Sequence, residues 1–268
     1  MDVEINYLLG AGRNAENKYN ERNKYKGKLS RLENALKVTE KKLIEKENEI
    51  KTKKEKTIFE KKKDKSVANL WYHKFRWFFT TNNHLVLAGR DSRNNELLIK
   101  KHMEDEDVYF HADIHGAPHV IIKNPKKEDI EEGDRREAAT FAGMFSSAWK
   151  SKIFSVDVYS TTPDQVSKTA NTGESVGSGA FVIRGKREYF RKLDLTCGLG
   201  FDEKLGVVSG PFDVIKSKHK LCFKLIPGEE RKSTVVAELK KKLEKKGITV
   251  TTEEIDAMLP PGDCKLIE

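Results

Sequence analysis

Residues 28–66 contain neither glycine nor proline, and this uninterrupted run constrains the fold more than any other feature of the sequence. An apolar residue recurs every seven positions along the run, at Leu29, Leu36, Leu43 and Ile50. Leu32 completes the first heptad, but the matching positions further along are polar, so the apolar seam is thin. We predict one long charged helix over roughly 14–65, which needs a partner helix because a helix this polar is marginal alone in water.

The positive charge of the chain is concentrated in its first quarter. Of the formal net charge of +9, residues 1–66 carry +7, from 19 basic and 12 acidic residues. A basic arm in front of a nearly neutral body indicates a polyanionic partner, most often nucleic acid. A solvated helix rich in lysine has the same composition, so charge alone leaves both interpretations open.

The cysteines and the hydropathy pattern bound the class of protein. Cys197, Cys222 and Cys264 are an odd number without CxxC spacing, which fits a reducing compartment and argues against a disulfide framework or a structural zinc site. No apolar run approaches the roughly 20 residues of a membrane span, and the N-terminus lacks the pattern of a signal peptide. We therefore expect a soluble cytoplasmic protein with no membrane contact, no bound metal and no cofactor.

The composition changes near residue 70, where aromatic and β-branched residues become frequent. Strands are predicted at "KFRWFFTT", "HLVLAGRD", "DVYFHADI", "HVIIKN", "SVDVYSTT", "GSGAFVIRGKREYF", "GVVSG", "DVIKS" and "LCFKLIPG". Helices are predicted at "NNELLIKKHM", over 134–150 with Asp134 as N-cap, over 233–246 capped by Ser233 or Thr234, and at "TTEEIDAML" with a capping box. The body is expected to be α+β, with a mainly antiparallel sheet and packed helices, preceded by a long α-helical coiled-coil arm.

The stretch "YFHADIHGAPHVIIKN" places three histidines and an aspartate close together. If it begins as a strand, His111, Asp113 and His115 alternate onto one face. A shared metal ion is disfavoured, because four residues of extended strand separate His111 from His115 by about 13 Å. Catalysis is no better supported, since the candidate nucleophiles Ser167 and Thr169 lack the G-x-S-x-G pattern. The third interpretation is a polar face that contacts phosphate or RNA.

Three polar stretches favour this third interpretation. They are "GRDSRNNE" (89–96), "QVSKTANTGESVGSG" (165–179) and "IRGKRE" (183–188). Guanidinium forks, hydroxyls and backbone N–H groups suit contacts to phosphate and sugar, which position a nucleic acid without reading its sequence. The aromatic residues of "WYHKFRWFF" are predicted to be mainly core rather than a stacking surface for bases.

Several of these stretches, in this order, resemble the C-terminal part of the NFACT family of ribosome quality-control factors. The matching stretches are "KFRWFFTTNNHLVLAGRDSRNNELLIKKHM", "DVYFHADIHGAPHVIIKN", "AATFAGMFSSAWK", "QVSKTANTGE" and "GSGAFVIRGK". They resemble the NFACT-R domain over about residues 70–190, and "AENKYNERNKYKGKLSRLENALKVTEKKL" resembles the coiled-coil arm of the family. The tail "GVVSGPFDVIKSKHKLCFKLIPG" resembles its archaeal-type extension. The expected division is a basic arm (1–68), an NFACT-R-like RNA-binding domain (69–192) and a C-terminal α+β extension completing that domain (193–268).

The resemblance implies a partner and a role. Family members bind large ribosomal subunits that carry a stalled nascent chain and a tRNA, and they recruit tRNA so that untemplated residues are added. The ribosome performs the peptidyl transfer, so the resemblance implies a scaffold that contacts rRNA and tRNA and not an enzyme. The NFACT-N domain, which holds the tRNA-recognition motif of the family, has no counterpart in this sequence. A separate chain or a missing N-terminal region is expected to supply it, together with the partner helix of the arm.

The predicted RNA-binding residues come from the three polar stretches and from the histidine stretch. They are Arg90, Asp91, Asn95, His111, Asp113, His115, Gln165, Lys168, Thr169, Arg184 and Lys186. The arginines, lysines and Asn95 are expected to contact the RNA backbone, and His111, Asp113 and His115 to organise that surface. No catalytic residue and no metal ligand is predicted.

Two alternatives stay open. In the first, His111, Asp113 and His115 belong to a metal-dependent or acid–base enzyme that processes RNA. In the second, the leucine seam makes the chain a coiled-coil interaction scaffold and its charge is incidental.

Overall fold

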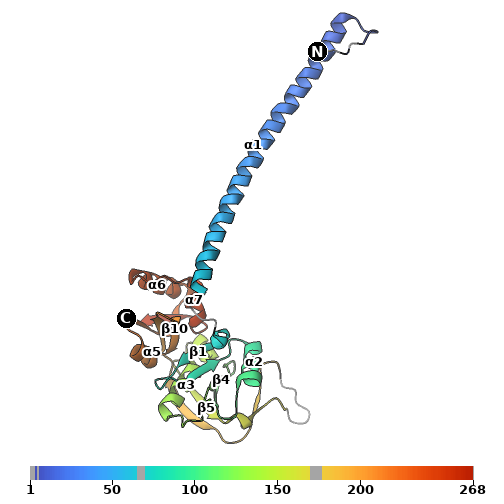
Figure 1. Cartoon of the computed structure of the whole chain (residues 1–268). Helices are drawn as coiled ribbons and strands as arrows, with labels where there is room; N and C mark the ends of the chain where they lie inside the picture. The colour runs from blue at the N-terminus through green and yellow to red at the C-terminus, as the bar shows by residue number, and fades with distance from the viewer. Residues whose placement is uncertain (1–3, 5, 65–69, 170–176, 268) are drawn as a thin grey trace. The chain divides into compact units, whose positions relative to one another are not determined.

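The structure, a computed structural model, describes residues 4, 6–64, 70–169 and 177–267, with most of 38–64 as backbone alone. The chain forms two compact units, residues 1–66 and 67–268, called the arm and the body below (Figure 1). No helix among the described residues combines the length and the apolar composition needed to cross a membrane.

The arm is one continuous helix, α1 (Ala11–Asp64), as the absence of helix breakers from 28–66 predicted. The side chains of Leu29, Leu32 and Leu36 are 61%, 64% and 60% exposed, so the start of the apolar seam is uncovered. The seam positions Leu43 and Ile50 lie where side chains are outside the described part of the chain. The long helix is confirmed, and its pairing with another helix stays a prediction.

The body is built on a six-stranded antiparallel sheet in the order β1-β2-β4-β3-β5-β8. Its strands are β1 (Arg76–Phe79), β2 (Leu85–Ala88), β3 (Val108–Ala112), β4 (Val120–Ile122), β5 (Ser155–Thr161) and β8 (Glu188–Asp194). Both faces are covered, which explains why β2 and β4 read as continuous apolar runs. The fold class predicted for the body, α+β with a mainly antiparallel sheet, is confirmed.

Successive side chains of each strand join opposite cores. Phe78, Val86 and Phe110 pack with α3 (Glu132–Met144) on one face. On the other face, residues such as Trp77, Leu87 and Tyr109 pack with buried side chains of α2 (Ser92–His102) and of the 3-10 helix η1 (Trp71–Lys74). The aromatic residues predicted to be core are buried at Phe75, Trp77 and Phe78, whereas Trp71 is 47% exposed.

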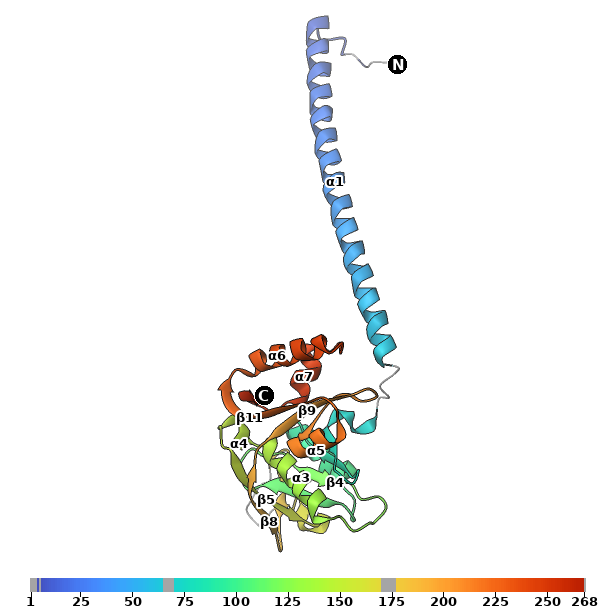
Figure 2. The ribbon, with the colours of Figure 1, turned by 90° about the vertical axis from the view of Figure 1, so that its left-hand side faces the viewer.

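A second antiparallel sheet, in the order β10-β9-β11-β12, is made of residues 197–267 alone. Its strands are β9 (Cys197–Asp202), β10 (Gly206–Pro211), β11 (Cys222–Glu230) and β12 (Cys264–Ile267). The helices α6 (Lys232–Lys245) and α7 (Thr252–Met258) pack against β12 and β10, respectively, and both views show the two helices side by side (Figures 1 and 2). One hydrophobic core contains residues of both sheets, so the C-terminal segment is integral to the body.

The structure differs from the predicted elements in several places. The predicted strand "DVIKS" is part of a helix, α5 (Phe212–Lys218). The predicted strand over 177–190 is divided into β7 (Val182–Ile183), which pairs with β6 (Val166–Ser167), and β8, because Gly185 turns the chain at φ +87°. The helix predicted over 134–150 is α3 followed by α4 (Ser147–Lys150). The cap predicted at Ser233 or Thr234 is wrong, since Arg231 is the N-cap of α6 and makes no side-chain cap bond.

Asp134 is not the cap of α3, because it lies within the helix and is buried. Its Oδ2 lies 2.9 Å from Nδ1 of His84, and both of its oxygens accept hydrogen bonds from Asn82. The predicted capping box of α7 is confirmed, with Thr251 and Glu254 each accepting from the backbone N–H of the other.

Candidate functional site

A cleft of about 560 Å³ opens in the body where four segments of the chain meet. Arg76 of β1, the segment 89–95 between β2 and α2, the turn 115–119 before β4 and the loop 178–181 supply most of its walls. The turn 115–119 and the loop 178–181 can approach each other closely because Gly116 and Gly179 adopt φ angles of +79° and +75°. A side chain on Gly179 would lie 2.6 Å from the Cα of Ser92, so this loop packs directly on the start of α2.

Two arginines line the cleft without acidic partners. Arg76 Nη1 donates a hydrogen bond to the Gly89 carbonyl at 2.9 Å, and its guanidinium carbon lies 4.6 Å from the ring centroid of Phe145. Arg90 Nη2 donates to the carbonyls of Phe75 and His73 at 3.2 and 3.3 Å. Within the described residues, the hydrogen-bond partners of both guanidinium groups are main-chain oxygens, and the buried Nε of Arg76 has none.

The electrostatics of these arginines follow from burial and from each other. Burial, and after it the charge of Arg90, lowers the pKa of Arg76 to about 10, although Asp91 acts in the opposite direction. Burial also lowers the pKa of Arg90. Arg76 still carries its charge at neutral pH. The cleft therefore holds two cations that repel each other and lack a bonded carboxylate.

The third histidine of the sequence stretch, His119, is buried beside the cleft and uses both ring nitrogens. Its Nε2 lies 2.9 Å from the carbonyl oxygen of Gly179, and its Nδ1 lies 2.5 Å from the hydroxyl of Tyr109. Because a carbonyl oxygen only accepts, Nε2 carries the proton and Nδ1 accepts from Tyr109. Burial, with a smaller contribution from His111, lowers the pKa of His119 to about 4. This imidazole is a neutral structural link.

His111, Asp113 and His115 do not alternate along one strand. That alternation was the condition under which they were predicted to face together. Strand β3 ends at Ala112, so the alternation stops before Asp113. His111 and His115 both line the cleft, whereas Asp113 is exposed outside its lining and donates its backbone N–H to the Asp157 carbonyl. No group of three His, Cys, Asp or Glu residues in the described ranges could hold a metal ion.

The second group of predicted residues surrounds a tight turn at residues 184–187, called the basic turn below. Arg184 donates from Nη1 to the Ser167 hydroxyl at 3.2 Å and from Nη2 to the Thr169 carbonyl at 2.8 Å. With its amide oxygen facing the Lys186 N–H, Gln165 makes two hydrogen bonds of 3.0 Å with the backbone of Lys186. Gln165 therefore braces this turn, and the charged side chains on it are exposed.

Lys168 connects the basic turn with the cleft. Its Nζ lies 3.4 Å from Oε2 of Glu96 and 5.2 Å from the ring centroid of Phe181, which lines the cleft. It also donates to the Gly177 carbonyl at 3.2 Å. The predicted residues thus gather in two neighbouring places, with Asp113 in neither.

Two of the predicted residues have local structural roles within the cleft wall. Asp91 is the N-cap of α2 and accepts from the Asn94 N–H at 2.8 Å. Asn95 accepts from the His119 N–H at 3.2 Å and lies against Gly89, where a side chain would clash with its Oδ1. The main role of these two side chains is therefore to fix the shape of the cleft.

Three arginines near these surfaces were not among the predicted residues. Arg76 is the first. The sequence feature that could have identified it is a charged residue inside the apolar run "KFRWFF". The other two stack on tyrosines: the guanidinium carbon of Arg187 lies 4.5 Å from the ring centroid of Tyr159, and that of Arg191 lies 3.9 Å from that of Tyr189. The cation–π pair of Arg187 and Tyr159 joins residues far apart in the sequence, so it appears only when β5 and the start of β8 are placed side by side.

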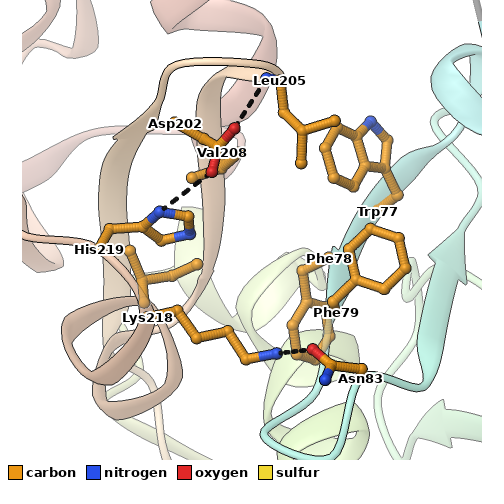
Figure 3. A pocket seen from close by; sticks show the side chains of 10 residues that line it. Trp77, Phe78, Phe79, Asn83, Asp202, Leu205, Val208, Lys218 and His219 are labelled. Atoms are coloured by element: carbon orange, nitrogen blue, oxygen red, sulfur yellow. Dashed lines mark hydrogen bonds and ion pairs between the residues drawn. The ribbon is translucent and has the colours of Figure 1, made fainter.

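A second pocket, of about 230 Å³, lies between β1 and the hairpin of β9 and β10 (Figure 3). Its apolar lining includes Trp77, Phe79 and Val208. Lys218 donates to Oδ1 of Asn83 at 2.7 Å and to the Thr80 carbonyl, and Nδ1 of His219 lies 3.9 Å from Oδ2 of Asp202. Among the described lining residues this pocket holds one lysine ammonium, bonded to neutral oxygens, whereas the cleft holds two guanidinium groups.

Comparison with known proteins places the cleft inside a described domain type. Residues 74–185 match the family model described as "NFACT protein RNA binding domain". All cleft residues except Pro261 lie within this range.

Longer matches extend over most of the chain. It is 38% identical over 217 residues to the archaeal Rqc2 homolog aRqcH of Methanocaldococcus jannaschii, covering 80% of this chain and 32% of that protein. It is 38% identical over 207 residues to the ribosome quality control complex subunit NEMF homolog of Drosophila melanogaster, covering 76% of this chain and 20% of the other. Human NEMF is 40% identical over 131 residues, which cover 49% of this chain and 12% of that protein. The chain spans about a third or less of the length of these relatives.

One solved structure, the C-terminal part of the fibronectin/fibrinogen-binding protein from Streptococcus suis, is also similar. The identity is 23%, the TM-score is 0.39, and the match covers 54% of this chain and 49% of the other. This likeness is too distant to bear on fold or function.

Proposed function

We propose that this chain, which carries the RNA-binding domain of the NFACT family, binds large ribosomal subunits carrying a stalled nascent chain and tRNA. The premise is its homology, over most of its length, to archaeal and eukaryotic ribosome quality-control factors. The ligand of the body in this proposal is RNA of the subunit or of the tRNA. The proposed location is the cytoplasm, where such subunits occur.

The observation that carries the proposal is the pair of uncompensated arginines in the cleft beside an exposed basic turn. Arg76 and Arg90 have main-chain partners only among the described residues, and Lys186 and Arg187 are exposed. RNA presents closely spaced phosphates, and guanidinium groups contact phosphates with two parallel donors. Contacts of this type supply affinity and depend strongly on salt.

A binding role agrees better with the site than catalysis does. His119 has both nitrogens engaged, and Asp113 lies outside the lining of the cleft to which His111 and His115 contribute. The named relatives from animals are subunits of a ribosome quality control complex. We therefore assign no catalytic residue to this chain.

The arm is proposed to act through its charge and its uncovered leucines. It carries +7 of the net charge of +9, and Leu29, Leu32 and Leu36 are exposed along α1. A helix with an uncovered apolar seam gains stability when that seam is packed against another helix. We propose that the partner helix and the NFACT-N part needed for tailing belong to a separate chain or to a segment outside this sequence.

Co-sedimentation with purified large subunits and, separately, with free tRNA tests the proposal across a salt series. We expect saturable binding that weakens as salt rises, because bound lysines and arginines release counterions from RNA. Arg184→Ala with Lys186→Ala should weaken binding and flatten its salt dependence. The matched control is Lys241→Ala with Lys245→Ala, which removes the same charge from exposed positions of α6 outside the matched domain.

The outcomes separate clearly. Equal loss in both double variants would mean that only total charge matters, and would contradict the assignment to the basic turn. Absence of binding to subunits and to tRNA at moderate salt would contradict the proposed function itself.

A further inference from the structure

The cleft has the size and shape of a ligand site, beyond what an RNA-binding surface requires. Its volume of about 560 Å³ lies within the range of roughly 300–1,000 Å³ that is typical of small-molecule sites. A double helix rests on a surface with its bases paired inward, whereas an unpaired nucleotide can enter a cleft. Four chain segments have to converge to form this one, with two glycines in the left-handed region.

One group of cleft residues fits a phosphate. The guanidinium of Arg76 is held against Phe145 and the Gly89 carbonyl, and that of Arg90 is held by the carbonyls of Phe75 and His73. Both cations are thereby fixed in place before any ligand arrives, which lowers the ordering cost of binding. A partly buried cation without an acidic partner is unfavourable, and a phosphate oxygen would relieve that cost.

The acidic residue of the cleft lining sets the charge balance. Asp91 is held as the N-cap of α2 by the Asn94 N–H, and it forms no ion pair with either arginine. Two guanidinium groups and one carboxylate leave an excess of one positive charge. That excess matches the single negative charge of a phosphodiester.

A second group of cleft residues fits a base. His111, His115 and Phe181 all line the cleft, and the ring centroid of His119 lies 5.1 Å from those of both His111 and Phe181. Burial lowers the pKa of His111, although backbone hydrogen bonds with Ala112 and Ala117 act in the opposite direction, so its imidazole is neutral at pH 7. Imidazole and phenyl rings are the groups on which splayed-out RNA bases stack and form edge contacts.

We propose that this cleft holds one unpaired nucleotide of an RNA strand, with its phosphate on Arg76 and Arg90 and its base beside His111, His115 and Phe181. The inference rests on the proposed function and names the form of RNA that the site takes. The phosphate is either an internal phosphodiester or the terminal monophosphate of a strand, and the experiment below distinguishes these sources.

The test measures binding of a labelled hexaadenylate and of a blunt twelve-base-pair RNA duplex by fluorescence anisotropy. Arg76→Gln with Arg90→Gln should weaken hexaadenylate binding about tenfold and duplex binding by less than about twofold. Arg184→Ala with Lys186→Ala should weaken both RNAs to a similar extent. Adenosine monophosphate should displace hexaadenylate from the unaltered protein, and adenosine should do so much less.

Two additional measurements keep the test decisive. Arg90→Gln alone should still reduce hexaadenylate binding, so a folding defect at the more buried Arg76 would not obscure the result. Hexaadenylate with a 5′-phosphate, a 3′-phosphate or two free hydroxyls identifies the source of the phosphate, because tighter binding of one phosphorylated end indicates a terminal monophosphate. Equal binding of all three indicates an internal phosphodiester.

The inference would be overturned if the arginine variants kept full affinity for hexaadenylate while the basic-turn variants lost it. In that case RNA binding, and with it the proposed function, would stand without the cleft. Failure of every RNA to bind would overturn both.

Discussion

The hydroxyl of Tyr109 lies 2.5 Å from Nδ1 of His119, whose Nε2 lies 2.9 Å from the carbonyl oxygen of Gly179. The imidazole of His119, which directly precedes β4, thus joins β3 to the loop 178–181, which lies 60 residues further along the chain. The geometry of the cleft depends on this link, because the turn at 115–119 and the loop at 178–181 form two of its walls.

Stability should fall with acid through His119. The pKa of His119 is lowered from 6.5 to about 4 in the folded protein by burial, so the unfolded chain binds a proton at a higher pH than the folded chain does. Protonation therefore favours unfolding as the pH drops from about 6.5 towards 4, by about 3 kcal/mol over the whole window. Urea unfolding at a series of pH values measures this slope.

The matched variants for that slope are His119→Asn and His115→Asn. His119→Asn should be less stable at pH 8 but should show a flatter profile between pH 6.5 and 4. His115 is exposed, and its replacement should keep the slope of the unaltered protein. An unchanged slope in His119→Asn would show that other groups cause the acid sensitivity.

A methyl group at Gly179 should disturb the cleft. Gly179 has φ +75°, and an added Cβ would lie 2.6 Å from the backbone of Ser92, so Gly179→Ala should cost at least about 1 kcal/mol in unfolding free energy. Gly177→Ala is the control, because no atom of the described residues lies within 4 Å of a Cβ there. Equal stability of the two variants in urea unfolding would contradict the close packing of this loop on α2.

The buried ion pair of Asp107 and Lys123 should be important for stability. Oδ2 of Asp107 lies 2.7 Å from Nζ of Lys123, and the two residues are 2% and 9% exposed. Asp107→Asn leaves the buried ammonium with Glu104, a largely exposed carboxylate 3.1 Å away, as its remaining charge partner among the described residues, and should cost about 3 kcal/mol. Glu128→Gln, which removes a carboxylate from an exposed pair with Lys126, should leave the denaturation midpoint nearly unchanged. The prediction fails if both variants unfold at the same urea concentration.

The body should fold without the arm. Residues 67–268 form a compact unit with its own core, so removal of residues 1–66 should leave the thermal midpoint of the body within a few degrees. The loss of +7 charges should still weaken binding to large subunits and reduce its salt dependence. A truncated protein that unfolds at a much lower temperature would show that the arm stabilises the body.

The sequence predicted the long helix and the fold class because both depend on local patterns. It failed at α5, where Val214 and Ile215 suggested a short strand but pack as a helix against β9 and β10. A Cβ on Gly198 would lie 2.8 Å from that of Ile215, so missing side chains on the sheet make room for this helix. Such a close approach depends on residues that are distant in sequence, so the local hydrophobic periodicity does not predict it.

The candidate site was predicted only in part for the same reason. The charged stretches 89–96 and 183–188 were recognisable as polar loops, but their division between a cleft and a separate turn is a property of the folded body. Arg76 was missed because its strand looks like core, and its exposure to the cleft depends on the end of β2 and on Phe145. Asp113 was grouped with the histidines on an alternation that requires a strand two residues longer than β3.

The 54 residues of α1 also set a length scale. At a rise of 1.5 Å per residue, an α-helix of this length measures about 80 Å from end to end. A partner bound near Ala11 would therefore be held at about this distance from a partner bound near Asp64. Two sites on one large assembly can bind both ends of α1 at once only if they are separated by about that distance. The length of the helix therefore restricts the pairs of sites that the protein can bind simultaneously.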